Sequence, residues 1–251
     1  MHVFDPLTLD DAARDKLASE LNTLLLPYFP ESTTEAIHRQ YFHSGIERSR
    51  IALLKEHDRL TGFQIVTSSP VTLPAGDFMI IRSVVARAQA NRTRGSRAFE
   101  RFGPTELIRQ ALRAHASGRR PWLLGQSAGP VTYMRLAPYF RAILPPPDPH
   151  ANASPAQRAI FVDLLRTIDM IPEHPEAWSM RNGPIYPISP DERVTWLGRP
   201  EPAVHRFFQE CPDAGTGQVL LFGVELTLPT LAAILPRQFQ HLMRRRKRAT
   251  T

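Results

Sequence analysis

The chain has 251 residues, of which 42% are hydrophobic and 22% are charged, a composition that suits one sizeable core and excludes a disordered or fibrous protein. Its single cysteine, Cys211, excludes an internal disulfide framework and any metal site built from several cysteines. The first residues carry neither a basic start nor an apolar run, so we expect no signal peptide and a reduced, cytoplasmic setting.

The formal net charge of +7 is unevenly distributed. Six of the 31 basic residues lie between Arg237 and Arg248, where there is no acid, so the rest of the chain is nearly neutral. A second basic cluster lies within the body, opposed by Glu100 alone: Arg82, Arg87, Arg92, Arg94, Arg97 and Arg101. A basic tail is typical of a solvated end, whereas a basic cluster in an ordered body usually has an anionic partner.

The predicted elements alternate between helix and strand in the first part of the chain. We expect a helix capped by Thr8 and ending before Pro27, a second helix over 32–42, and two strands, 50–56 and 61–68, joined by a polar turn. An apolar strand over 78–86, a helix from Pro104 to His115, a short strand over 121–124 and a helix starting at Pro130 follow. This order predicts a mixed α/β sheet covered by helices.

Proline is unevenly distributed along the chain, since residues 138–236 carry 16 of the 24 prolines. The run 145–149 is a stiff break, after which we expect a helix capped by Ser154, a Pro-rich irregular stretch and a strand over 218–227. The predicted division is a core over 1–144, a Pro-rich insertion over 145–217, a last core strand with an apolar segment over 218–236, and a basic tail over 237–251.

The segment after the strand 78–86 is the strongest candidate for chemistry. It reads Arg92-Thr93-Arg94-Gly95-Ser96-Arg97 and precedes a helix. A glycine-containing turn between a strand and a helix presents backbone N–H groups that bind phosphate, and arginines add charge-assisted contacts. The same composition is also typical of a solvated loop.

Together with the order of elements, this segment resembles the GNAT superfamily of acyl-coenzyme A-dependent transferases. Residues Arg92-Thr93-Arg94-Gly95 match the first four positions of the family motif [Q/R]-x-x-G-x-[G/A], whereas Arg97 stands where Gly or Ala is expected. The resemblance covers about residues 1–140 and the strand 218–227. It implies a GNAT-like fold, with a mixed and mostly antiparallel central sheet flanked by helices.

The resemblance also implies a mechanism. Backbone groups of Val84, Val85 and Ala86 would face the pantetheine arm of acetyl-CoA or a longer acyl-CoA, and Arg92, Arg94, Gly95 and Ser96 would hold its pyrophosphate. An amine or hydroxyl acceptor would attack the thioester, and Tyr133, on the helix after the short strand, would protonate the leaving thiolate. An acyl-carrier protein could replace CoA as the donor, and spacing does not single out a general base among Glu56, His57 and Asp77.

A competing motif lies between the short strand and the next helix. Residues 125–129 match G-x-S-x-G, the nucleophile elbow of α/β-hydrolases, with Ser127 as nucleophile. An acid at Asp169 or Asp191 with His205 or His241 could complete a triad, although no His-Gly-Gly segment precedes the motif. A serine hydrolase and a non-catalytic GNAT-like binding module therefore stay as alternatives.

The C-terminal region suggests a surface contact. The stretch from Val219 to Leu235 is almost entirely apolar, but Glu225 and Pro229 favour a buried strand and a short amphipathic segment over a membrane span. With the basic residues that follow, this segment could lie peripherally on an anionic inner membrane surface, the alternative being a solvated end. We expect no specific nucleic-acid binding and, because the histidines are scattered, no metal.

Overall fold

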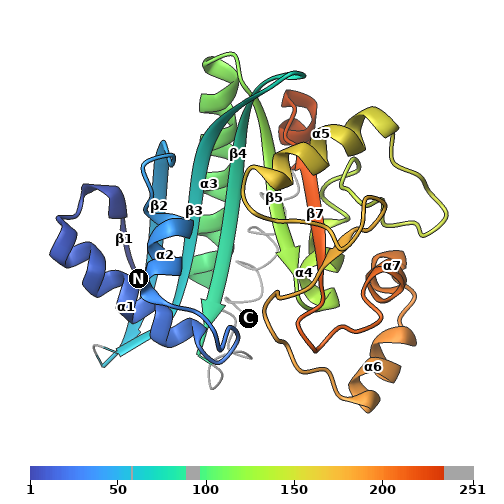
Figure 1. The fold of residues 1–251 in the computed structure, drawn as a ribbon, viewed down its shortest axis with the longest axis horizontal. Coiled ribbons are helices and arrows are strands. Elements are labelled where there is room, and N and C mark those ends of the chain that lie inside the picture. The colour runs from blue at the N-terminus through green and yellow to red at the C-terminus, as the bar shows by residue number, and fades with distance from the viewer. Residues whose placement is uncertain (58, 89–96, 235–251) are drawn as a thin grey trace, which may run out of the picture.

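The computed structural model describes residues 1–57, 59–88 and 97–234, which form a seven-stranded sheet with helices on both faces (Figure 1). The strand order is β1-β2-β3-β4-β5-β7-β6, and neighbouring strands are antiparallel except for the parallel pair β4 and β5. The fold-class prediction of a mixed and mostly antiparallel sheet flanked by helices is confirmed.

The amino-terminal elements begin differently from the prediction. A short edge strand, β1 (His2–Phe4), pairs with β2 (Arg48–Glu56) and was not foreseen. Thr8 closes a 3-10 turn over Pro6–Thr8, and the helix α1 (Asp11–Leu25) is capped instead by Asp10, whose side chain accepts a hydrogen bond from the N–H of Ala13 at 2.7 Å. The expected cap at Thr8 is therefore wrong, while the end of the helix before Pro27 is right.

Two long hairpins follow the helix α2 (Thr34–Tyr41). The strands β2, β3 (Arg59–Leu73) and β4 (Gly76–Arg87) pair in antiparallel fashion and alternate their side chains between the two faces. One face packs under α1 and α2, where apolar side chains of both layers form a cluster around Leu21, Ile37 and Phe63. The expected second helix and the first two strands are confirmed.

The helix α3 (Arg97–Ala116) covers the opposite face of the sheet, behind β3 and β4 in Figure 1. It begins at Arg97, before Pro104, so the expected start is wrong and Pro104 lies inside the helix. The strand β5 (Arg120–Ser127) and the helix α4 (Pro130–Leu136) come next, as expected.

The Pro-rich part contains more helix than the sequence suggested. After α5 (Pro155–Arg166) and the short strand β6 (Ser179–Met180), the stretch expected to be irregular holds α6 (Pro190–Leu197) and α7 (Pro202–Glu210). Each of these three helices starts with proline, which is favoured at the first helical position because its missing N–H is not needed there. The chain then enters β7 (Val219–Glu225) and a helical stretch over 228–234.

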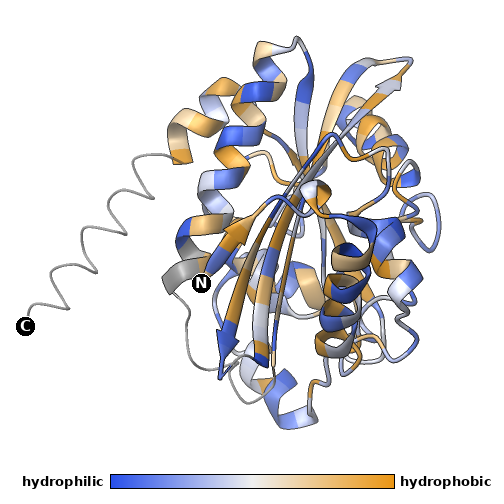
Figure 2. Ribbon diagram, turned by 90° about the vertical axis from the view of Figure 1, so that its left-hand side faces the viewer, coloured by the Kyte–Doolittle hydropathy of each residue, from blue (hydrophilic) through white to orange (hydrophobic). Residues whose placement is uncertain are grey.

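The insertion and the sheet share one hydrophobic core. Phe161 and Phe207 belong to the same buried cluster as Ile80 and Trp122, so residues 145–217 pack directly on the strands. Figure 2 shows the twisted sheet between the two layers of helices. Within the described part of the chain, no helix combines the length and the apolar character needed to cross a bilayer. The predicted basic tail over 237–251 lies outside the described residues.

Candidate functional site

The parallel strands β4 and β5 pair over only part of their length. Their register runs from Phe78 opposite Arg120 to Arg82 opposite Leu124, and no pairing follows. Yet β4 continues to Arg87 with β3 on one side, and β5 continues to its end with β7 on one side. The sheet therefore opens into a split at the carboxyl ends of both strands, and among the described residues no strand pairs with the facing edges beyond Arg82 and Leu124 (Figure 1).

The free edge of β4 can be assigned residue by residue. The N–H of Ala88 donates to the carbonyl of Thr61 in β3 at 2.9 Å, and the register between β3 and β4 runs without a shift. Successive residues of a strand direct their N–H and C=O groups to alternate edges. Val84 and Ala86 therefore pair with β3, whereas Ser83 and Val85 direct their backbone groups into the split. Of the three residues predicted for the pantetheine arm, Val85 has the required orientation.

Segments from elsewhere in the chain border the open end of the split. The hydroxyl of Tyr28, just after α1, donates to the carbonyl of Arg87 at 2.7 Å, and the carbonyl of Tyr28 accepts from the N–H of Ile185 at 2.8 Å. The neighbouring Tyr186 packs by the start of α4, since a Cβ on Gly129 would lie 3.5 Å from its ring. The insertion therefore crosses from the α1 side of the split to the β5–α4 turn.

Positive charge gathers at this open end. Burial lowers the pKa of the Arg87 guanidinium, and the nearby positive charge of Arg135 lowers it further. Arg87 ends β4, and Arg135 lies on α4, which follows β5, so the two cations come from opposite sides of the split. An anion bound between them would relieve their repulsion. The predicted pyrophosphate residues Arg92, Arg94, Gly95 and Ser96 follow β4 directly but lie outside the described residues.

Tyr133, the predicted general acid, lies in the core. Its side chain is completely buried, and its hydroxyl donates to the carbonyl of Pro145. Burial is the main cause that raises the pKa of this hydroxyl well above its ordinary value. A nearby arginine, Arg206, holds the same loop by donating to the carbonyl of Pro149 at 3.0 Å. This arrangement fits a residue that anchors the proline run, and the acid role stays a prediction that the geometry does not favour.

Ser127, the nucleophile of the alternative hydrolase reading, ends β5 and pairs with Leu220 of β7. It is buried, and its hydroxyl donates to the carbonyl of Gly129 at 2.6 Å. A nucleophile elbow needs a strained turn that holds the serine hydroxyl exposed. Among the described non-glycine residues, positive φ angles occur at His57, Asp169 and Asn182 and not at Ser127, so this strain is not present.

The candidate bases do not converge on the split. Asp77 lies at the amino end of β4, the end away from the opening, and accepts a hydrogen bond from the Thr72 hydroxyl at 2.6 Å. Glu56, the last residue of β2, and His57, in the turn that follows, are exposed. In the described part of the chain, no three or more His, Cys, Asp or Glu side chains are grouped to hold a metal ion.

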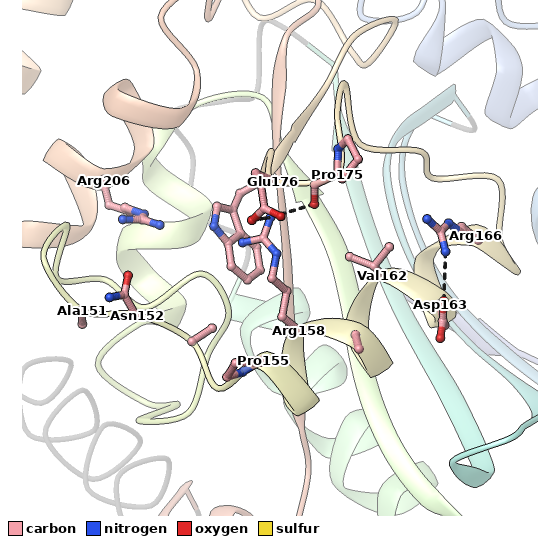
Figure 3. Close-up of a pocket in the computed structure, with 13 residues that line it drawn as sticks. Ala151, Asn152, Pro155, Arg158, Val162, Asp163, Arg166, Pro175, Glu176 and Arg206 are labelled. Atoms are coloured by element: carbon pink, nitrogen blue, oxygen red, sulfur yellow. Dashed lines mark hydrogen bonds and ion pairs between the residues drawn. The ribbon is translucent and has the colours of Figure 1, made fainter.

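A separate pocket of about 640 Å³ runs along α5 within the insertion (Figure 3). Its charged side chains pair within the protein: the Arg158 guanidinium stacks on Trp178 at 4.2 Å and lies 3.5 Å from Glu176, and Arg166 lies 3.0 Å from Asp163. With its cations neutralised in this way, the pocket is less suited to an anionic ligand than the split.

Several residues of the split were missed by the sequence analysis. Tyr28, Arg135 and Tyr186 come from three separate segments, so no local pattern could have brought them together. Arg82, at the last paired position of β4, was named in the basic cluster but was not assigned to the site. Its signal was a charged residue within the apolar run Phe78–Ala86.

Comparisons with known proteins find similarity of structure at low identity. No family model and no curated protein matches the chain. Among solved structures, smu.2055 from Streptococcus mutans is 13% identical with a TM-score of 0.38, over 90% of this chain and 100% of that one. A probable N-acyltransferase from Enterococcus faecalis is 13% identical with a TM-score of 0.33, over 54% and 31% of the two chains. The aminoglycoside 6'-N-acetyltransferase from Enterococcus faecium is 16% identical with a TM-score of 0.32, over 50% and 61%. This chain thus spans less than two thirds of the latter two proteins.

Proposed function

We propose that the chain is a GNAT-like acyltransferase that takes acyl-CoA in the split between β4 and β5 and transfers the acyl group to an amine or hydroxyl acceptor. The observation that carries this proposal is the early end of the β4–β5 pairing at Arg82 and Leu124. Unpaired backbone N–H and C=O groups need partners, and the amide groups of an extended pantetheine arm match the free edge at Ser83 and Val85.

The order of elements supports the same proposal. The GNAT family opens with a strand and two helices, continues with a hairpin and a fourth strand followed by a helix, and then has a short strand and another helix. The chain has β1, α1, α2, the hairpin β2–β3, then β4, α3, β5 and α4 in this order. The initial strand, which the sequence analysis missed, completes the match.

The electrostatics suit the phosphates of the donor. Arg87 and Arg135 bring two positive charges to the open end, and the predicted phosphate loop begins directly after β4. With the phosphates there, the pantetheine arm runs along β4 toward Arg82. The thioester then lies near the closed end of the split, close to the N–H groups of Ser83 and Val85.

In the transfer step, the acceptor nitrogen or oxygen attacks the thioester carbonyl carbon and forms a bond to it while the carbon–sulfur bond breaks. The acceptor loses a proton to solvent or a base, and the thiolate takes one up. The chain's own contribution is positional: backbone N–H groups on the free edge of β4 bind the carbonyl oxygen as negative charge develops there.

Titration calorimetry with CoA tests the proposal. We expect Arg87→Met and Arg135→Met each to weaken CoA binding by about tenfold, equivalent to roughly 1.4 kcal/mol, because each removes a charged contact to phosphate. Arg48→Met is the matched control, since Arg48 is exposed on β2 and lies 3.9 Å from Glu47; it should bind CoA as the wild type does. Absence of CoA binding by the wild-type chain would contradict the proposal, and binding without turnover would favour a non-catalytic module.

A further inference from the structure

Arg82 occupies the position where the split begins. It is the last residue of β4 that pairs with β5, and it lies opposite Thr67 in β3. Two residues further along β4, Val84 packs with Ile65 under α1 and α2, so by strand alternation Arg82 lies on this same face of the sheet. The strand thus places a guanidinium beside the closed end of the split, on the side where α2 lies.

The Arg82 guanidinium has no acidic partner in the described part of the chain. Within residues 1–57, 59–88 and 97–234, no carboxylate lies within 4.0 Å of it, and it donates no hydrogen bond to a side chain or a carbonyl. Arg120, at the other end of the β4–β5 pairing, shows the usual arrangement, because it donates two hydrogen bonds to Glu225 at 2.8 and 2.9 Å. Arg82 is half-buried, and this burial is the main cause that lowers the pKa of its guanidinium.

A second donor comes from α2, on the same face of the sheet. Tyr41, on the last turn of α2, is buried, and the positive charge of Arg82 acts on its hydroxyl, although burial has the larger effect and raises the pKa. Among the described residues this hydroxyl has no hydrogen-bond partner. The guanidinium and the phenol, both donors, therefore lie on the same side of the sheet, and neither has an acceptor among the described residues. Buried polar groups normally have a partner, so the pair has the chemistry to receive an anionic oxygen.

We propose that Arg82 and Tyr41 bind a carboxylate group of a small substrate at the closed end of the split. The planar guanidinium matches a carboxylate in bidentate fashion, and the Tyr41 hydroxyl can donate a third hydrogen bond. The inference rests on the proposed function, which puts the reacting thioester near Ser83, the residue after Arg82. The carboxylate then belongs either to the acceptor, as in an amino acid, or to the far end of the acyl group, as in a dicarboxylic acyl-CoA.

The acceptor arm of the test measures turnover of acetyl-CoA with amino acids and with the matching amino-acid amides, by detection of the released thiol. Wild type should prefer the carboxylates, and Arg82→Met should lose that preference by about tenfold or more in kcat/KM, since hydrogen bonds to a charged group are lost. Tyr41→Phe removes only the hydroxyl and should reduce the preference less. Arg48→Met, on the same sheet but far along β2, is the control and should keep the wild-type preference.

The donor arm measures binding of succinyl-CoA and butyryl-CoA, which differ in the terminal carboxylate, by calorimetry. If the carboxylate belongs to the acyl group, wild type binds succinyl-CoA at least tenfold more tightly, and Arg82→Met removes the difference. In every variant, the affinity for CoA itself should stay within twofold of wild type, which shows that the fold and the cofactor site are intact. If Arg82→Met does not fold, Tyr41→Phe provides the same comparison.

The outcomes separate this inference from the proposed function. Loss of carboxylate discrimination in either arm, with unchanged CoA affinity, supports the inference and identifies the source of the carboxylate. Equal use of carboxylates and amides, together with equal binding of the two acyl-CoAs, overturns the inference and leaves the proposed function in place. If wild type binds no CoA, the proposed function fails and the inference fails with it.

Discussion

The substitution Tyr133→Phe separates a structural role of this tyrosine from a catalytic one. It removes only the hydroxyl that donates to the buried carbonyl of Pro145, so that carbonyl loses its partner. A buried acceptor left unsatisfied costs about 1–2 kcal/mol. For a chain of this size, each kcal/mol corresponds to roughly 2–4 °C in the melting temperature, so we expect a decrease of about 2–8 °C.

The assay combines unfolding with turnover. Urea and thermal unfolding give the stability, and turnover per folded protein gives the chemistry. A general acid contributes about a hundredfold or more to the rate, far beyond what lost packing changes in the folded fraction. We expect turnover within twofold of wild type. Tyr139→Phe is the control, because Tyr139 makes no side-chain hydrogen bond within the described residues. A turnover loss of a hundredfold with unchanged stability would refute this reasoning and restore Tyr133 as the acid.

The remaining predictions concern packing and reactivity. The Cys211 thiol is buried, and burial raises its pKa, so a thiol reagent at pH 8 should label it only after unfolding. Rapid labelling of the native protein would show that the core around Cys211 becomes accessible to the reagent. Gly223→Ala should destabilise the fold by about 1–3 kcal/mol in urea unfolding, because the new Cβ would lie 2.6 Å from Phe161 and 2.8 Å from Leu124. Unchanged stability would mean that these two side chains move aside without cost. A fluorophosphonate probe should not label the chain, and labelling abolished by Ser127→Ala would favour the hydrolase.

Local patterns predicted the regular elements well where one face is buried. The strand Phe78–Ala86 and the helix over 32–42 were both predicted from their local sequence, whereas the predicted cap at Thr8 was wrong. The edge strand β1 was missed because three residues carry no periodicity and are ordered by pairing with β2. Prolines 190 and 202 lie in the stretch that was expected to be irregular, although each begins a helix.

The site was less accessible to sequence reasoning than the fold. The end of β4 could be located, but the separation of β4 from β5 depends on how far two distant segments pair, which no local pattern specifies. Arg82 shows what the sequence does reveal: a charge within an apolar strand marks an unusual position. It does not reveal that the charge lacks an acid among the described residues, because the segments around Arg82, such as α2 and β5, come together only in the folded chain.

The most direct test of the central claim is a crystal structure of the chain with acetyl-CoA. The account predicts the pantetheine arm between β4 and β5, with its amides hydrogen-bonded to the backbone of Ser83 or Val85 and its phosphates near Arg87 and Arg135. Acetyl-CoA bound elsewhere, or β4 and β5 paired to their ends with no room between them, would contradict it.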